Sequence, residues 1–341
     1  MNLFFYSSPY KYYAENIIPV AKHARKMGHN VYGAYSFDKS TSIKGTNEIP
    51  ILPNNSGCDQ LRLFLNGSLN IDAVIITQPW WYMEFKIVSY CKKHRIPFYI
   101  IDHAPIMTEY VERNGKESHL YRASLRGCRA FFSYGQNTID IMKKKGCEEN
   151  MVSMGSPRFE GMMKSIKKHK RKVDGESKIA VIYDTSARME DEAVVKSMVR
   201  LRKALGASDN WQFLLKEHPR SPKVFRQLCD SYENFNIYRG KSNEELIAMS
   251  SLDIFSFPSS SMILSAMAGN GMAGLYGNHF STHARSYSNR YSNIIFDYVN
   301  NKLSRNIEVS KKYKPFLKEN IKLLEIPSKI RILNYIEKDL R

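Results

Sequence analysis

Short apolar runs alternate along the chain with longer stretches in which apolar residues recur at helical spacing. The short runs, bounded by Gly, Pro or Asn, are typical of strands buried on both faces of a parallel sheet, and the longer stretches predict helices packed on that sheet. In the amino-terminal half, strands are expected at residues 2–6, 71–77, 97–101 and 130–135, and a helix at residues 17–27. This alternation predicts βαβ units and therefore an α/β fold.

The same alternation returns in the carboxy-terminal half. Strands are expected there at residues 178–183, 213–215, 235–238 and 254–257, and a helix at residues 262–268. Between the halves, residues 164–178 are rich in Lys and show no apolar periodicity, which is typical of a linker. We therefore expect two domains, at residues 1–165 and 176–310, followed by a basic segment of short helices at residues 311–341.

Composition adds a strong positive charge to this picture. The chain has 341 residues, and its 51 Lys and Arg against 33 Asp and Glu leave a formal net charge of +18. Such a charge favours anionic partners: nucleic acid, phospholipid headgroups or a phosphorylated substrate. The basic residues do not cluster with interleaved aromatic residues in a recognisable nucleic-acid-binding module, so nucleic acid is the least favoured of the three.

The cysteines and the apolar segments bear on the cellular compartment. The five cysteines are scattered and include no Cys-x-x-Cys pair, so neither a disulfide framework nor a zinc site is indicated. No apolar run approaches the roughly 18 residues of a membrane-spanning helix, and the amino terminus lacks the features of a signal peptide. We expect a protein of the reducing cytoplasm.

Candidate chemistry lies where the expected strands end, because open α/β sheets bind ligands outside the carboxyl ends of their strands. The strand at residues 213–215 leads into Lys216, Glu217, His218 and Pro219. A His held by a Pro-stiffened turn can donate a hydrogen bond to a phosphate, although a solvated loop His is the ordinary alternative. His218 is therefore a candidate for binding a phosphate.

Three serines follow the strand expected at residues 254–257. Ser259, Ser260 and Ser261 open the next helix, where unpaired backbone N–H groups and hydroxyls converge at the positive end of the helix dipole. Serines also simply cap helices, but three in a row exceed what one cap requires. These residues predict an anion site.

A third strand end combines a carboxylate with an imidazole. Residues 97–101 lead into Asp102, His103, Ala104 and Pro105. The carboxylate could orient the imidazole or raise its basicity, as a general base acting on a hydroxyl requires. Adjacent residues on an extended chain point to opposite sides, so a structural role for Asp102 stays open.

Resident cofactors are not indicated. The Gly-x-Gly-x-x-Gly pattern at residues 269–274 follows an expected helix instead of a strand, so a nicotinamide dinucleotide is not expected, and no cluster of metal ligands is visible.

Taken together, these segments resemble the GT-B transferases, and among them the CDP-glycerol glycerophosphotransferases of teichoic-acid and capsule assembly. That family carries a His-Gly loop in its first domain, a Gly-x-Pro-Arg before the interdomain link, a His-Pro after a strand, and a Ser-Ser pair opening a helix. The matching positions, over roughly residues 70–275, are His103, residues 155–158 ending in Arg158, His218 with Pro219, and Ser260 with Ser261. His-Pro and a serine pair also mark GT-B sialyltransferases and Kdo transferases that use CMP-sugars.

The chain departs from the family pattern at two positions. His103 is followed by Ala104 instead of Gly, and Ser265 stands where many relatives have an Asp or Glu that can bind ribose hydroxyls. A hydroxyl cannot reproduce the bidentate acceptance of a carboxylate. This departure implies either that the donor is held differently here or that activity is reduced.

The resemblance implies two Rossmann-like domains with parallel sheets facing across a cleft, the first for the acceptor and the second for the nucleotide donor, with the last helices packing back on the first domain. It implies a transferase that moves a glycerol-phosphate or sugar unit from a cytidine-nucleotide donor to a cell-surface polymer or its lipid-linked precursor. No cofactor is implied beyond the nucleotide-activated donor. Peripheral association with the inner face of the cell membrane would suit the excess Lys of the last helices.

The implied roles fall on a defined set of residues. His103, aided by Asp102, is the expected base for the acceptor hydroxyl, and His218 holds the leaving phosphate. The expected donor-binding residues are Arg158, Asp184, Thr185, Ser186, Arg188, Lys216, His218, Pro219, Ser259, Ser260 and Ser261. A CMP-sugar or UDP-sugar GT-B glycosyltransferase is the alternative activity, and a catalytically silent GT-B scaffold or a nucleic-acid-binding protein is the alternative of another class.

Overall fold

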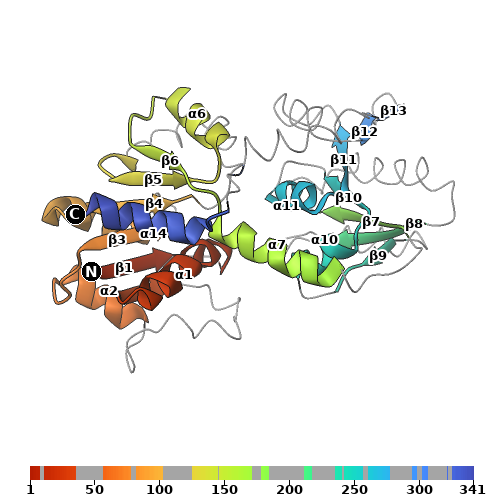
Figure 1. Cartoon of the computed structure of the whole chain (residues 1–341). Helices are drawn as coiled ribbons and strands as arrows, with labels where there is room; N and C mark the ends of the chain where they lie inside the picture. Colours follow the sequence, from red (N-terminus) through yellow and green to blue (C-terminus); the bar gives the residue numbers. More distant parts are fainter. Residues whose placement is uncertain are drawn as a thin grey trace. The chain divides into compact units, whose positions relative to one another are not determined.

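The computed structural model describes two compact units. The described residues are 1–7, 11–35, 57–77, 82–102, 125–144, 146–170, 178–183, 211–216, 235–239, 242–255, 260–276, 294–297, 302–305, 321 and 325–341. One unit comprises Met1–Glu160 with Lys318–Arg341, and the other comprises Gly161–Leu317. Each is built around a sheet of mostly parallel strands (Figure 1).

The sheet of the first unit has six strands in the order β2-β1-β3-β4-β5-β6, and every neighbouring pair is parallel. Its strands are β1 (Asn2–Ser7), β2 (Asn30–Tyr35), β3 (Ala73–Thr77), β4 (Phe98–Ile101), β5 (Ala130–Ser133) and β6 (Met151–Ser153). The described helices that accompany them are α1 (Lys11–Lys26), α2 (Gly57–Leu65), α3 (Tyr82–His94), α6 (Gln136–Lys144), the beginning of α7 (Pro157–Lys170), and α14 (Ser328–Asp339).

Both faces of this sheet are covered, which is why its strands are apolar throughout. Leu3 and Phe5 of β1 lie in a core cluster with α1 and α14, whereas Phe4 and Tyr6 lie in a second cluster with α2 and α3. The alternation follows from the pleat, which points successive side chains to opposite faces. The expected strands of this half are confirmed by β1, β3, β4 and β5.

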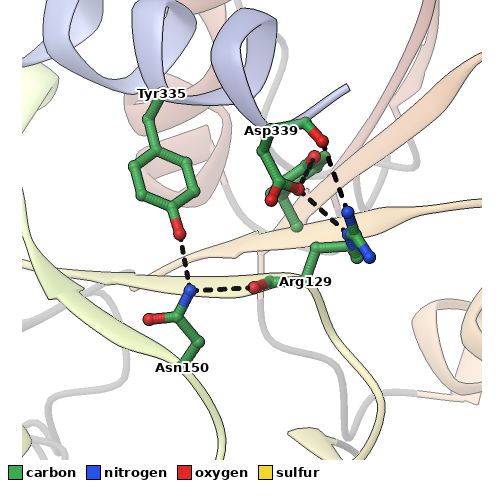
Figure 2. A network of polar contacts seen from close by, with 5 residues as sticks. Arg129, Asn150, Tyr335 and Asp339 are labelled. Atoms are coloured by element: carbon green, nitrogen blue, oxygen red, sulfur yellow. Dashed lines mark hydrogen bonds and ion pairs between the residues drawn. The ribbon is translucent and has the colours of Figure 1, made fainter. Parts of the chain in front are cut away.

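The carboxy-terminal helix α14 packs on the first sheet beside α1 (Figure 1). Ile332, Leu333 and Ile336 are fully buried there. A polar network anchors its last turns, because Arg129 Nε donates to Asp339 Oδ2 over 3.0 Å and Asn150 Nδ2 donates to the Tyr335 hydroxyl over 2.5 Å (Figure 2). Both core packing and polar contacts therefore tie the chain's end to the first unit.

The second unit contains a seven-stranded sheet in the order β13-β12-β11-β10-β7-β8-β9, in which only the β12–β13 pair is antiparallel. Its strands are β7 (Lys178–Tyr183), β8 (Trp211–Lys216), β9 (Phe235–Ile237), β10 (Leu252–Phe255), β11 (Gly271–Tyr276), β12 (Ile294–Asp297) and β13 (Lys302–Arg305). Two of the described helices lie wholly within this unit: α10 (Asn243–Met249) and α11 (Ser260–Ala268). The strands expected at residues 178–183, 213–215 and 235–238 are confirmed by β7, β8 and β9. The strand expected at residues 254–257 corresponds to β10, which begins earlier, at Leu252, and residues 256–257 lie outside the described residues.

The Lys-rich stretch between the halves differs from expectation. We expected a linker over residues 164–178, but residues 164–170 are the last turns of α7. Met162 and Ile166 are buried one turn apart and the lysines around them are mostly exposed. Lys is a good helix former, and two buried positions suffice to seat the helix, although they are too few to register as a periodic pattern.

Candidate functional site

The order of the second sheet brings three strand ends together. β7 lies between β10 and β8, and the register pairs Tyr183 with Phe255 on one side and with Lys216 on the other. All three strands are parallel, so their carboxyl ends lie side by side at one edge of the sheet, where α/β proteins bind ligands. The chain runs on from these ends into the segments that the sequence singles out.

Most of those segments lie outside the described residues. This applies to Asp184, Thr185, Ser186, Arg188, His218, Pro219 and Ser259. Lys216, Ser260 and Ser261 are described. Their positions are what the structure adds to the predicted donor site.

Lys216 is the last residue of β8 and lies against an aromatic ring. Its Nζ is 5.7 Å from the centroid of Tyr238, at cation–π distance. The Tyr238 hydroxyl donates to Glu245 Oε2 over 2.9 Å. Burial and this carboxylate raise the pKa of Tyr238 to about 12, so the phenol stays protonated at neutral pH. The strand end and Tyr238 therefore hold a positive charge at the carboxyl edge of the second sheet.

Ser260 and Ser261 are the first two residues of α11, which follows β10. Ser261 is half-buried, and the next residues, Met262 and Ile263, are in the core. The amino end of α11 therefore comes just after the carboxyl end of β10 in the chain, with its backbone N–H groups unpaired within the helix. This arrangement fits the anion site that the sequence predicts.

Ser265, farther along α11, faces the interior of the second unit. It is fully buried, and its hydroxyl donates to Asp253 Oδ2 over 2.5 Å. Asn270 Nδ2 donates to the same oxygen over 2.9 Å and to the Ile247 carbonyl over 2.7 Å. Ser265, where the resemblance implies a ribose-binding carboxylate, is thus part of a buried network. Its side chain donates to Asp253 within the core.

Asp253 is a buried acid held by neutral donors. Its exposure is zero, and burial raises its pKa, while the hydrogen bonds from Ser265 and Asn270 lower it. The nearby Tyr183, at the end of β7, has a pKa well above its ordinary value because of its burial and, second, the charge of Asp253. The hydrogen-bond network joins β10 to α11 and to the turn after it, and these elements lead into the predicted donor site.

At the first sheet, Asp102 immediately follows β4. It is only 2% exposed, and its backbone N–H donates to the Phe132 carbonyl over 2.9 Å. Burial raises the pKa of the neighbouring Tyr134, the charge of Asp102 raises it further, and the charge of Arg158 opposes both. The charges of Asp102 and Arg158 therefore act on the Tyr134 hydroxyl in opposite directions. His103 is outside the described residues.

Arg158 is bound to a carboxylate on α1. Its Nε donates to Glu15 Oε2 over 2.9 Å, and its side chain is only 12% exposed. The guanidinium carbon is also 5.8 Å from the Phe159 ring. Arg158 thus joins the first turns of α1 and α7, and an anionic ligand would compete with Glu15 for it.

Sequence reasoning missed the buried polar group beneath this edge. Asn16 Oδ1 accepts from the Tyr134 hydroxyl over 2.7 Å and from Ser156 Oγ over 3.2 Å, and Ser156 Oγ in turn caps α7 by accepting from the Phe159 N–H. Asn16 is fully buried. The sequence contains a sign of this role, because Asn16 directly precedes Ile17, the first of the apolar residues by which α1 packs on the sheet.

Solved structures match this chain over nearly its whole length, although sequence comparison finds no match. No protein-family model matches the chain, and no curated protein matches its sequence. UDP-GlcNAc 2-epimerase from Neisseria meningitidis, solved with UDP-GlcNAc bound, is 13% identical with a TM-score of 0.66, covering 99% of this chain and 100% of its own. The UDP complex of S. aureus MnaA is 12% identical with a TM-score of 0.67, covering 100% and 97%. The wall teichoic acid polymerase TagF is 14% identical with a TM-score of 0.62, covering 99% and 88%.

The chain has the GT-B fold. The two Rossmann-like units and these full-length structural matches decide the fold, as the sequence predicts. At such low identity the likeness carries no residue roles, so these rest on the chain itself.

Within the described part of this GT-B chain, the two strand edges hold different sets of groups. Lys216, Ser260 and Ser261 belong to the second sheet, and Asp102 and Arg158 to the first. No group of three or more His, Cys, Asp or Glu side chains within the described ranges is placed to hold a metal ion. None of the described helices combines the length and apolar character needed to cross a membrane.

Proposed function

We propose that this GT-B protein is a transferase that moves a glycerol-phosphate or sugar unit from a cytidine-nucleotide donor to a cell-surface polymer or its lipid-linked precursor. One observation carries the proposal. The register of β10, β7 and β8 sets their carboxyl ends side by side, and the chain leads from these ends into the serine-rich helix start, the Asp184 segment and His218. The full-length match to a wall teichoic acid polymerase supports the class of acceptor.

The donor phosphates are held at the second sheet. His218 and the hydroxyls and N–H groups of Ser259 to Ser261 donate to them, and Lys216 and Arg188 offset the charge that develops as the nucleotide leaves. Asp184, Thr185, Ser186 and Pro219 complete this donor site. Lys216 is pre-positioned by Tyr238, which reduces the entropic cost of ordering a long side chain on binding.

The acceptor hydroxyl is activated at the first sheet. Its oxygen attacks the donor, its proton passes to the imidazole of His103, and the nucleotide departs with the electron pair of the broken bond. Because Asp102 is almost fully buried, we assign it the orientation of that imidazole and not direct contact with substrate. Arg158 contributes positive charge once a ligand anion displaces Glu15.

Transfer from radiolabelled CDP-glycerol and CMP-sugars to lipid-linked and polymeric acceptors tests this function. His218→Ala and Ser260→Ala should each lower turnover at least about a hundredfold, the scale of lost electrostatic stabilisation. The matched controls are His169→Ala and Ser165→Ala, because these two side chains bond to each other within α7. The last residue of α7, Lys170, donates to the Ala268 carbonyl, at the end of α11 opposite Ser260. Full transfer activity in His218→Ala and Ser260→Ala would contradict the proposal.

A UDP-sugar donor is the second candidate, favoured by the structural neighbours solved with UDP or UDP-GlcNAc. Incubation with UDP-GlcNAc, with and without acceptor, distinguishes it. If transfer needs both UDP-GlcNAc and an acceptor, the donor is a UDP-sugar and not a cytidine nucleotide. If UDP-GlcNAc is converted without an acceptor, the protein is not a transferase. A catalytically silent scaffold should act on none of these nucleotides.

A further inference from the structure

The outward face of α3 carries cations and an exposed aromatic ring. Phe85 is 47% exposed, and Lys86, Lys92 and Lys93 are exposed on the same helix. The single acid of α3, Glu84, has no exposure. The solvent-facing side of this helix therefore presents positive charge without an acid of its own.

This arrangement follows from how α3 sits on the first sheet. The positions that it buries in the core beside β3 are Ile87, Val88 and Cys91. With about 100° of rotation per residue, Lys86 and Lys93 fall opposite this stripe, and Phe85 and Lys92 fall together on one flank. A ring and a lysine on the same side of a helix, about two turns apart, can contact one surface at the same time.

The turn before β5 adds to the same surface. Lys92 Cε lies 3.7 Å from the position that a Cβ on Gly127 would take, so the lysine stem crosses this turn. Burial lowers the pKa of Lys92 and the charge of exposed Arg126 lowers it further, while Glu149 acts in the opposite direction. Cations from two separate segments are thus gathered on this surface.

We propose that this face of α3, defined by Phe85, Lys86, Lys92 and Lys93, docks on an anionic phospholipid bilayer. Lysines bind the phosphates of the headgroups, and an exposed ring beside them enters the interface, as on amphipathic helices that lie on membranes. The proposal assigns to α3 the membrane contact that the sequence suggests for the last helices. Vesicle binding is measured without nucleotide, so either proposal can fail without the other.

The carboxy-terminal helix is a poorer membrane surface, although the sequence points to it. Its apolar residues Ile332, Leu333 and Ile336 are fully buried. Its outer positions include acids, since Glu337 bonds to His29 over 2.7 Å and Asp339 to Arg129 over 3.0 Å. No apolar face of α14 is left for lipid.

Co-sedimentation of the full chain with phosphatidylcholine vesicles, with and without phosphatidylglycerol, tests the surface. We expect salt-sensitive binding only when phosphatidylglycerol is present. The double variant Lys86→Glu with Lys93→Glu should bind at least about tenfold more weakly, given about fivefold for each lysine near a membrane. Phe85→Ala, which leaves the net charge unchanged, should also weaken binding.

The control is Lys329→Glu with Lys338→Glu on α14, which changes the net charge by the same amount. It should stay within about threefold of the unaltered chain if the α3 face is the docking surface. Thermal unfolding of each variant checks its fold. Equal loss in the two double variants, loss only in the α14 variant, undiminished binding in the α3 variant, or no binding by the unaltered chain would each overturn the proposal.

Discussion

The hydroxyl of Ser265 on α11 donates a 2.5 Å hydrogen bond to Asp253 on β10, inside the second unit. Both residues have no exposure. Asn270, at the turn after α11, completes the group by donating to the same carboxylate oxygen. The helix that begins with Ser260 and Ser261 is thereby fixed to the strand that precedes it, and Ser265, at the position where the family resemblance implies a ribose-binding acid, is part of the core.

This relationship predicts the outcome of restoring the acid. Ser265→Glu would bury a second carboxylate against Asp253, and we expect it to destabilise the protein by about 3 kcal/mol or more. Ser265→Ala removes one donor and should cost about 1–3 kcal/mol. Chemical denaturation followed by tryptophan fluorescence measures both. A Ser265→Glu protein that keeps its stability and binds nucleotide more tightly would show that the position faces the ligand.

The raised pKa of Asp253 predicts a pH-dependent stability. In the folded protein this pKa is above the ordinary value of 3.8, so the unfolded chain releases the proton first as pH rises. The contribution of Asp253 to stability is therefore fully present below pH 3.8 and is lost as pH rises through the folded pKa.

Asp253→Asn removes this dependence while its amide oxygen can still accept hydrogen bonds. We expect the free energy of unfolding of Asp253→Asn, relative to the unaltered protein, to increase as pH rises above 3.8 and to level off only above the folded-state pKa of Asp253. Urea denaturation across this range measures the difference. A difference that is constant with pH, or that falls as pH rises, would contradict the assignment.

Asn16 supports the edge of the first sheet through two hydrogen bonds. Asn16→Ala would leave the Tyr134 hydroxyl and Ser156 Oγ without their acceptor in a buried place, so we expect a loss of about 2 kcal/mol or more. Tyr134→Phe in the Asn16→Ala background removes one of these donors and should recover part of the loss. A double-mutant cycle measured by denaturation tests this, and strict additivity of the two changes would speak against the bond.

The packing of α14 predicts a sharp contrast between neighbouring positions. Leu333 is fully buried and Asn334 is exposed. Leu333→Ala should destabilise the protein by about 2–5 kcal/mol through loss of burial and a residual cavity. Asn334→Ala should change stability by no more than about 0.5 kcal/mol. Similar effects at the two positions would contradict the placement of this helix.

The fold was predictable because strands buried on both faces of a parallel sheet are apolar throughout, and such short apolar runs are visible in the sequence. The GT-B expectation, which added the order of a few motifs, is confirmed. The paired roles of Asp253 and Ser265 were not predictable, since twelve residues and a helix turn separate them and neither belongs to a periodic pattern. The same holds for Asn16, whose partners Tyr134 and Ser156 come from the far end of the first unit.

The assigned roles of Lys216, Ser260 and Ser261 rest on strand ends and a helix start, which sequence locates well. The other roles in the candidate site depend on pairings between side chains that are distant in the sequence, and Arg158 on α7 is an example. Arg158 looks like a cation available to an anion, yet Glu15 holds it at 2.9 Å. A Glu on the first turns of a helix gives no local sign of which cation it will meet.

Calorimetric titration of the full chain with CMP, CDP and UDP tests the central claim most directly, because it asks whether the second sheet holds a cytidine nucleotide. We predict that CMP or CDP binds more tightly than UDP, and that His218→Ala weakens this binding at least about tenfold, the cost of losing a hydrogen bond to a charged group. Failure of all three nucleotides to bind, or binding of UDP alone, would contradict the account.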